Sequence, residues 1–220
     1  MREKQINEQY LLPLVLHDIK SPLRFIGTVL HEMKLNCEAV NINTTKNHIS
    51  ILQDTIVSLQ DYCDKIYEWS ELFNAHFKEN IAYNVDEIFD QVKAMYAPLI
   101  EFKGIAFNVQ QTAIKTVVQK NALSTIVFNL IDNAYKNTEA GTISLKAIEE
   151  NNNLQIIISD TGKGMDELMV HSAITNNVQF SHASLGYYII NSLLEKINGK
   201  ITIHSNLGVG TEIIISLSDH

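Results

Sequence analysis

The sequence predicts an α+β protein in which a long antiparallel helical hairpin precedes an α/β sandwich. Two series of apolar residues, spaced alternately three and four apart, predict the helices of the hairpin. Strand-like runs rich in β-branched residues, separated by short polar or glycine-rich turns, predict the sheet of the sandwich. The chain has 220 residues, enough for two domains, and we expect a hairpin over residues 1–80 and a sandwich over 81–220.

The hairpin prediction rests on two apolar seams joined by the polar linker NCEAVNINTTKN, whose Asn and Thr residues favour caps and turns. A second apolar stripe accompanies each seam, and leaving it exposed is costly because burying a Leu or Ile is worth about 1.5–3 kcal/mol. Two hairpins paired as a four-helix bundle would cover both stripes, which predicts a homodimer. The seams consist of Leu12, Leu16, Ile19, Leu23, Ile26, Leu30, Met33 and Cys37, then Ile49, Leu52, Ile56, Leu59, Cys63, Ile66, Ser70, Phe73 and Phe77.

The pattern of apolar residues changes after about residue 79, where the second part of the chain begins. NVDEIFDQVKAMYAPLIEFKG predicts a strand end and an amphipathic helix, which Pro98 is placed to break or kink. GTISLKAIEE and NLQIIISD predict a β-pair around a polar turn, and GKITIHSNLGVGTEIIISL repeats that pattern around a glycine-rich turn. Strands in one layer and helices in the other make an α/β sandwich.

Composition excludes several classes of function. The net charge is −8 and no basic tract occurs, so no nucleic-acid partner is expected. No apolar run approaches the roughly 20 residues of a membrane span, so this segment should make no membrane contact. Its polar start, MREKQINEQY, is unlike a signal peptide, and its two cysteines, Cys37 and Cys63, fit reduced thiols. We therefore expect a cytoplasmic protein, or the cytoplasmic part of a membrane-bound sensor.

The first motif that suggests chemistry is HDIKSPL, in which His17 lies at the edge of the first seam. A helical histidine is most often an ordinary surface or core residue. Here Asp18 is adjacent, Ser21 lies one turn further on, and Pro22 should bend the helix. A carboxylate that orients an exposed imidazole and takes up its proton makes the ring nucleophilic.

The second motif is NLIDNAYKNT, which places Asn129, Asn133, Lys136 and Asn137 on one side of a helix. Amide oxygens suit a hard cation such as Mg²⁺, and a lysine suits the phosphates that this cation bridges. A solvated polar face is the alternative reading.

The third motif, DTGKGM, places Asp160 at a strand end, where a carboxylate can accept a hydrogen bond from an exocyclic amine. Gly162 and Gly164 would let the backbone approach a ring. In the fourth motif, SNLGVGTE, two glycines form a tight turn before Thr211. Each pattern is common when it occurs alone, but the four motifs in this order are specific.

Together the motifs resemble those of the sensor histidine kinases of two-component signalling, over about residues 10–218. HDIKSPL is similar to the phosphoacceptor box, NLIDNAYKNT to the N box, DTGKGM to the first glycine box and SNLGVGTE to the last. The resemblance implies that ATP phosphorylates His17, that Asp18 assists, and that Ser21 positions water for dephosphorylating a partner. It also implies transfer to an aspartate of a response-regulator receiver domain.

The same resemblance implies a nucleotide site. Asn133 would bind Mg²⁺, with Asn129 and Lys136 near the phosphates. Asp160 would read the adenine amine, with two glycines beside the ring. The whole implied ATP site comprises Asn129, Asn133, Lys136, Asn137, Asp160, Gly162, Gly164, Leu185, Gly186, Gly208, Gly210 and Thr211.

Two departures from the family pattern concern the lid, about residues 165–183. Where the family has a GxGLGL stretch, only Leu185 and Gly186 agree, and His182, Ser184 and Tyr187 differ. The lid is also short and lacks the usual Phe-containing box, unless Phe180 serves that role. The departures predict weak ATP binding and leave a second interpretation open, a degenerate kinase that acts as a dimeric scaffold or only as a phosphatase.

A hydrolase with the same ATP-binding fold, resembling gyrase or mismatch-repair ATPases, is the other enzyme class considered. Those proteins use a Glu four residues before the Mg²⁺-binding Asn to activate water. That position is Asn129 here, and an amide cannot accept a proton at neutral pH. Transfer to His17 is therefore the favoured reaction.

Overall fold

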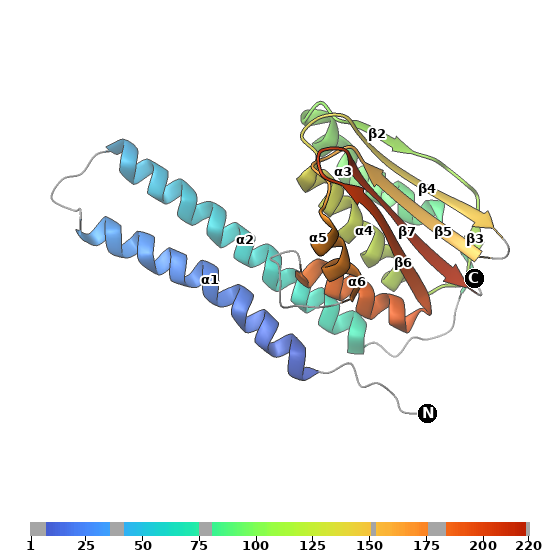
Figure 1. Ribbon diagram of the computed structural model, residues 1–220, viewed down its shortest axis with the longest axis horizontal. Helices are drawn as coiled ribbons and strands as arrows, with labels where there is room; N and C mark the ends of the chain where they lie inside the picture. The colour runs from blue at the N-terminus through green and yellow to red at the C-terminus, as the bar shows by residue number, and fades with distance from the viewer. Residues whose placement is uncertain (1–7, 36–41, 75–80, 151–152, 176–183, 219–220) are drawn as a thin grey trace. The chain divides into compact units, whose positions relative to one another are not determined.

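The computed structural model describes residues 8–35, 42–74, 81–150, 153–175 and 184–218 (Figure 1). The chain divides into two compact units, Met1–Asn74 and Ala75–His220. The boundary predicted near residue 80 falls in 75–80, outside the described residues. No helix among the described segments is both long enough and apolar enough to cross a bilayer.

The first unit contains two long helices, α1 (Glu8–Leu35) and α2 (Ile42–Asn74), which contact each other (Figure 1). α2 begins at Ile42, whereas the apolar seam placed its start at Ile49, so the prediction of a turn over the Asn- and Thr-rich stretch was wrong from Ile42 on. Asn and Thr cost only a few tenths of a kcal/mol in a helix, and packing readily overrides that cost.

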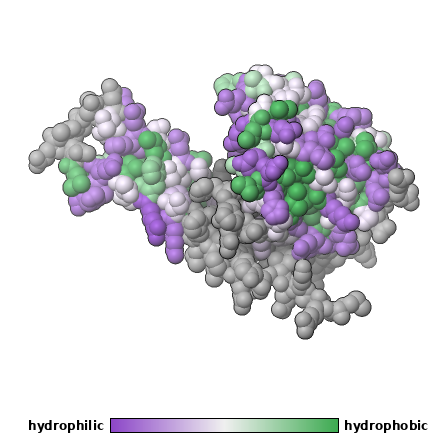
Figure 2. Space-filling view, in the orientation of Figure 1, coloured by the Kyte–Doolittle hydropathy of each residue, from purple (hydrophilic) through white to green (hydrophobic). Residues whose placement is uncertain are grey.

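Large apolar side chains remain on the surface of these two helices. Val29 is buried, but Leu23 and Leu30, two residues of the first seam, are each 52% exposed. Figure 2 shows hydrophobic residues between hydrophilic ones on the visible surface of this unit. The exposed apolar residues of α1 and α2 are Leu23, Phe25, Leu30, Leu35, Ile49, Ile51, Ile56, Val57 and Tyr67.

The second unit is built on a five-stranded mixed sheet with the strand order β2-β4-β5-β7-β6 (Figure 1). β2 and β4 are parallel, and the other neighbours are antiparallel. The strands are β2 (Ala106–Val109), β4 (Thr142–Glu150), β5 (Asn153–Asp160), β6 (Gly199–Asn206) and β7 (Gly210–Ser218), and a separate small pair joins β1 (Tyr83–Asn84) to β3 (Lys115–Thr116). Helix α4 connects the parallel neighbours, as a parallel pair requires.

Helices cover one face of this sheet, which confirms the predicted α+β class (Figure 1). They are α3 (Asp86–Phe102), α4 (Lys120–Asn137), α5 (Glu167–Thr175) and α6 (Ser184–Lys196). The core lies between the layers, where the strands contribute rows of apolar residues in register. One buried row comprises Leu145, Ile158, Ile213 and Ile203.

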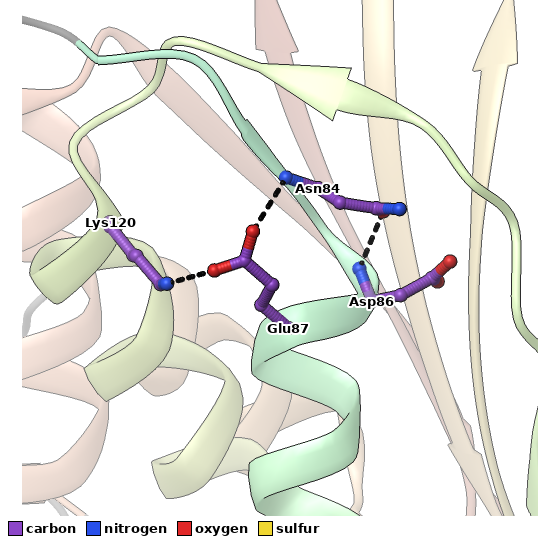
Figure 3. Close-up of polar contacts among 4 residues, drawn as sticks. All are labelled: Asn84, Asp86, Glu87 and Lys120. Atoms are coloured by element: carbon purple, nitrogen blue, oxygen red, sulfur yellow. Dashed lines mark hydrogen bonds and ion pairs between the residues drawn. The ribbon is translucent and has the colours of Figure 1, made fainter.

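Two local features fix the helices that pack beside the sheet. At the start of α3, Asn84 Oδ1 accepts from the Asp86 amide at 3.0 Å, and Glu87 Oε1 accepts from the Asn84 amide at 3.2 Å (Figure 3). This reciprocal pair is similar to a capping box. Glu87 also pairs with Lys120, the first residue of α4 (Figure 3).

The predicted break at Pro98 does not occur, because α3 continues to Phe102.

Candidate functional site

A row of polar side chains follows the apolar rows at one end of the sheet. Asp160 is the register partner of Thr211, which is the partner of Ser205. The Ser205 hydroxyl lies 2.9 Å from the Thr211 hydroxyl and donates to the Gly210 carbonyl at 3.0 Å. It also accepts the Met165 amide at 2.7 Å. These bonds tie β6 and β7 to the loop after β5, so the row is a fixed polar edge of the core.

Glycines allow backbone segments to meet closely behind this polar row. A Cβ on Gly164 would lie 2.0 Å from the Asn206 carbonyl oxygen, and one on Gly210 would lie 2.0 Å from the Asp160 carbonyl oxygen. Both glycines also have positive φ, +66° and +134°. In addition, the Gly208 amide donates to the Lys163 carbonyl at 2.8 Å. The two predicted glycine motifs are therefore packed against each other.

The Asp160 carboxylate is half-buried in this arrangement. Burial raises the pKa of its carboxyl above the ordinary value, while hydrogen bonds from the amides of Gly162 and Thr211 lower it in part. The bond from the Gly162 amide to Oδ1 is 2.8 Å long. A partly desolvated carboxylate with acceptor capacity left over can bind a donor group of a ligand.

Helix α4 approaches the same loop with its C-terminal end. The Asn137 carbonyl accepts from the Lys163 amide at 3.1 Å, and a Cβ on Gly162 would lie 2.3 Å from that carbonyl oxygen. The Asn137 amide group in turn donates to the Asn133 carbonyl at 2.8 Å. Gly186 faces Asn133, because a Cβ there would lie 4.0 Å from Asn133 Nδ2. The structure thus brings α4, α6 and the glycine motifs to one place.

Two residues predicted near the phosphates make other contacts. The Asn129 amide group donates to the Thr125 carbonyl at 2.9 Å, one turn back on α4. Lys136 forms an ion pair with Asp132 at 2.8 Å, and its side chain is 52% exposed. Both lie on the helix that carries Asn133, and these contacts join them to other residues of α4.

A magnesium ion fits the Asn133 position in its donor chemistry. The side-chain amide of Asn133 is half-buried and makes no hydrogen bond to any other described residue. Among these residues no group of three His, Cys, Asp or Glu could hold a metal ion. Mg²⁺ typically takes one or two protein oxygens together with substrate phosphates and water, so a single amide oxygen is compatible with it.

The remaining predicted residues are described less fully. His17, Asp18 and Ser21 all belong to α1, and Ser21 is exposed, whereas the side chains of His17 and Asp18 lie outside the described part of the structure. Leu185 is in the first turn of α6 and its side chain is also outside it. His182 and Phe180 lie outside the described residues altogether.

Ser205 is a site residue that sequence reasoning missed. Its hydroxyl contacts Met165 in the loop after β5 and the adjacent residues Gly210 and Thr211 of β7. A signal was present in the sequence, because Ser205 follows Ile201 and Ile203 at period two and so occupies an inward position of its strand. A polar side chain at an inward position usually has specific partners.

Comparison with known proteins gives this arrangement a family. Residues 118–220, which include α4, α6 and both glycine motifs, match the family described as histidine kinase-, DNA gyrase B-, and HSP90-like ATPase. The autoinducer 2 sensor kinase/phosphatase LuxQ of Vibrio parahaemolyticus is 25% identical over 219 residues, covering 91% of this chain. The chain is thus similar to sensor histidine kinases.

Solved structures show the same fold. The histidine kinase ThkA, in its complex with the response regulator protein TrrA, superposes with a TM-score of 0.73 at 20% identity, covering 96% of this chain and 61% of that one. ShkA in complex with AMPPNP has a TM-score of 0.62 at 19% identity, over 93% of this chain and 45% of that one. The chain spans 25% of the length of LuxQ.

Proposed function

We propose that this chain is an ATP-dependent protein-histidine kinase that phosphorylates its own His17 and passes the phosphoryl group to an aspartate of a response-regulator receiver domain. The observation that carries the proposal is the polar edge formed by Asp160, Thr211 and Ser205, enclosed by glycines that admit no Cβ. The match of residues 118–220 to the histidine kinase-like ATPase family and the similarity of the chain to LuxQ support it.

ATP would bind with its adenine at this edge. The Asp160 carboxylate would accept from the exocyclic amine, and Gly162 and Gly164 would keep side chains away from the ring. Mg²⁺, held by Asn133, would neutralise phosphate charge, with Asn129 and Lys136 close to the phosphate chain. ShkA, which shares the fold, was solved with the ATP analogue AMPPNP.

The transfer itself would form a bond between a His17 ring nitrogen and the γ-phosphorus of ATP. The bond from that phosphorus to the bridging oxygen breaks, and ADP leaves. Asp18 would orient the imidazole and take up its proton. The family model also covers DNA gyrase B-like ATPases, but Asn129 stands where a hydrolase needs a carboxylate base. That residue favours transfer to His17 over transfer to water.

Two partners belong to the proposal. A second copy of the chain would cover the apolar surface of α1 and α2 as a four-helix bundle. A receiver domain would take the phosphoryl group, as suggested by ThkA, whose structure is a complex with a response regulator. The exposed Ser21, one turn from His17, would position water when the same protein dephosphorylates its partner.

A scaffold or phosphatase that no longer turns over ATP is the second candidate, favoured by His182 and Ser184 at positions that are glycine in the family pattern. Calorimetry with Mg-ATP separates the two functions. A kinase binds the nucleotide at millimolar concentration or below, and a scaffold does not.

Incubation with γ-labelled ATP tests the kinase proposal. We expect acid-labile, base-stable label that disappears in His17→Gln, because a glutamine amide is not a nucleophile. His31→Gln is the matched control, since His31 is an exposed histidine of the same helix, and it should label normally. Asn133→Ala should also abolish labelling. Label that persists in His17→Gln would disprove the assignment of the phosphorylated residue.

A further inference from the structure

Tyr187 is a buried residue of α6 whose hydroxyl group reaches the polar edge of the sheet. Its side chain is 7% exposed, and its hydroxyl donates to the Met165 sulfur at 3.9 Å. Met165 also gives its backbone amide to Ser205, the residue that binds Thr211. The Tyr187 hydroxyl therefore lies at the end of the sheet where Asp160 is found.

The partner of this hydroxyl is a poor one. A thioether sulfur is a weak acceptor, and Met165 provides the sole hydrogen bond to the Tyr187 hydroxyl that the described residues form. A buried tyrosine hydroxyl ordinarily has a stronger acceptor. This donor is thus available to a bound molecule that offers a better lone pair.

Burial, together with the charge of Asp160, keeps that donor protonated. Burial, and secondarily the Asp160 carboxylate, raise the pKa of Tyr187 to about 12. The Tyr187 hydroxyl nevertheless donates its hydrogen bond to the Met165 sulfur rather than to the Asp160 carboxylate. A buried, neutral O–H donor and a half-buried carboxylate acceptor consequently lie at the same end of the sheet.

The Tyr187 hydroxyl and the Asp160 carboxylate together complement the hydrogen-bonding groups of adenine but not those of guanine. Adenine carries an amine donor at C6 beside an acceptor nitrogen at N1, whereas guanine carries an oxygen acceptor at C6 beside an N1–H donor. We propose that Tyr187 is a specificity-determining residue whose hydroxyl donates to adenine N1 while Asp160 accepts from the adenine amine. This inference rests on the proposed function, in which Asp160 binds adenine. It adds a second contact at a position where the family pattern has no tyrosine.

The test removes each side of the proposed hydrogen bond in turn. Calorimetry would measure the affinities of the full chain and of Tyr187→Phe for ATP, for GTP and for 1-deaza-ATP, in which a C–H replaces N1. Tyr187→Phe should bind ATP about three- to tenfold more weakly, as expected for one neutral hydrogen bond. The wild-type chain should bind 1-deaza-ATP more weakly than ATP by a similar factor, and the variant should show no further loss. Its preference for ATP over GTP should fall.

Tyr188→Phe is the matched control, because the adjacent tyrosine is also buried. Apart from burial, the groups that shift the pKa of Tyr188 are Ser192 and Glu195 rather than Asp160. Tyr188→Phe should keep the wild-type affinities for all three nucleotides. Thermal melting without nucleotide would show that both variants fold, and the 1-deaza-ATP comparison in the wild-type chain requires no variant. If Tyr187→Phe weakens ATP and 1-deaza-ATP equally, or neither, the inference is wrong while the kinase proposal stands. If the wild-type chain binds no ATP, the kinase proposal itself fails.

Discussion

The carboxyl group of Asp160 has a raised pKa because burial disfavours its charged form more than the amides of Gly162 and Thr211 favour it. A carboxyl whose folded-state pKa lies above its unfolded-state value stabilises the fold only while it is protonated. That contribution is present below the unfolded value and is lost as pH rises through the folded value. Above the raised value the charged carboxylate therefore opposes folding, and its presence fits the proposed role in binding a ligand.

Asp160→Asn tests this conflict between stability and function. The asparagine oxygen can still accept from the Gly162 amide, but no charge is buried. We expect the free energy of unfolding of the wild type, relative to that of Asp160→Asn, to decrease as pH rises from below the ordinary carboxyl pKa through the raised one. Urea unfolding across a pH series measures this difference. A difference that grows with pH would show that hydrogen bonds outweigh burial at this carboxylate.

Two glycines of the candidate site provide a matched comparison of backbone strain and close approach. Gly164 and Gly208 have similar positive φ, +66° and +73°, but only at Gly164 would a Cβ meet the Asn206 carbonyl oxygen, whereas nothing lies within 4 Å at Gly208. Gly208→Ala should cost about 1–2 kcal/mol of folding free energy from φ alone. Gly164→Ala should cost about 3–5 kcal/mol because the backbone must also move. Equal losses in thermal or urea unfolding would mean that the loop yields freely.

Individual residues of the site differ in how far the sequence could predict them. Asp160 and Gly162 belong to a short motif, so their mutual hydrogen bond is local and follows from adjacency. Ser205 acquires its role only when strand pairing places it beside Thr211, and Tyr187 only when α6 packs over Met165. Such contacts join residues far apart in sequence, and no spacing rule gives them.

At the scale of the elements, one buried interaction and one surface ion pair hold the start of α3. The Asp86 carboxylate is buried and accepts from the Thr112 and Ala113 amides at 2.9 and 2.8 Å, which fixes the turn where Ala113 has a φ of +54°. The Glu87–Lys120 pair joins α3 to α4, but its side chains are 50% and 38% exposed. Because the hydrogen bonds of Asp86 are buried, we expect them to contribute more to stability than the exposed Glu87–Lys120 pair.

Substitutions of these two acids should separate accordingly. Asp86→Ala should lower the free energy of unfolding by about 2–4 kcal/mol, since two buried amides lose their acceptor. Glu87→Ala should lower it much less, as is usual for an exposed ion pair. Urea denaturation followed by circular dichroism measures both. A larger loss in Glu87→Ala would mean that the link between the helices, and not the buried turn, holds this corner.

The extent of the helices shows where element prediction succeeds and fails. The helix predicted at NLIDNAYKNT lies in α4, whose buried residues recur at three and four. The start of α2 was missed, whereas α3 was predicted as a helix and is not broken at Pro98. The error in α2 arises from local propensity, which costs less than the packing that an extended helix gains.

At the scale of the whole molecule, the exposed apolar residues of α1 and α2 are the feature that the single chain leaves unexplained. Leu23, Leu30, Ile49 and Ile56 all belong to the predicted seams, and each is 46–52% exposed. A monomer seldom leaves so many large apolar side chains along two helices in water. A second copy with the same surface would bury them symmetrically, since a two-fold interface pairs a patch with itself.

Ile56→Asp separates folding of the helices from their association. Because Ile56 is 46% exposed in the single chain, a carboxylate there can remain solvated in a monomer. In the proposed bundle the same carboxylate would be buried without a partner, which is costly. Sedimentation should therefore find the wild type as a dimer and Ile56→Asp as a monomer with unchanged helical circular dichroism. Gln53→Asp, at an exposed polar position of α2, is the control and should stay dimeric. A dimeric Ile56→Asp chain would mean that the two copies associate through another surface.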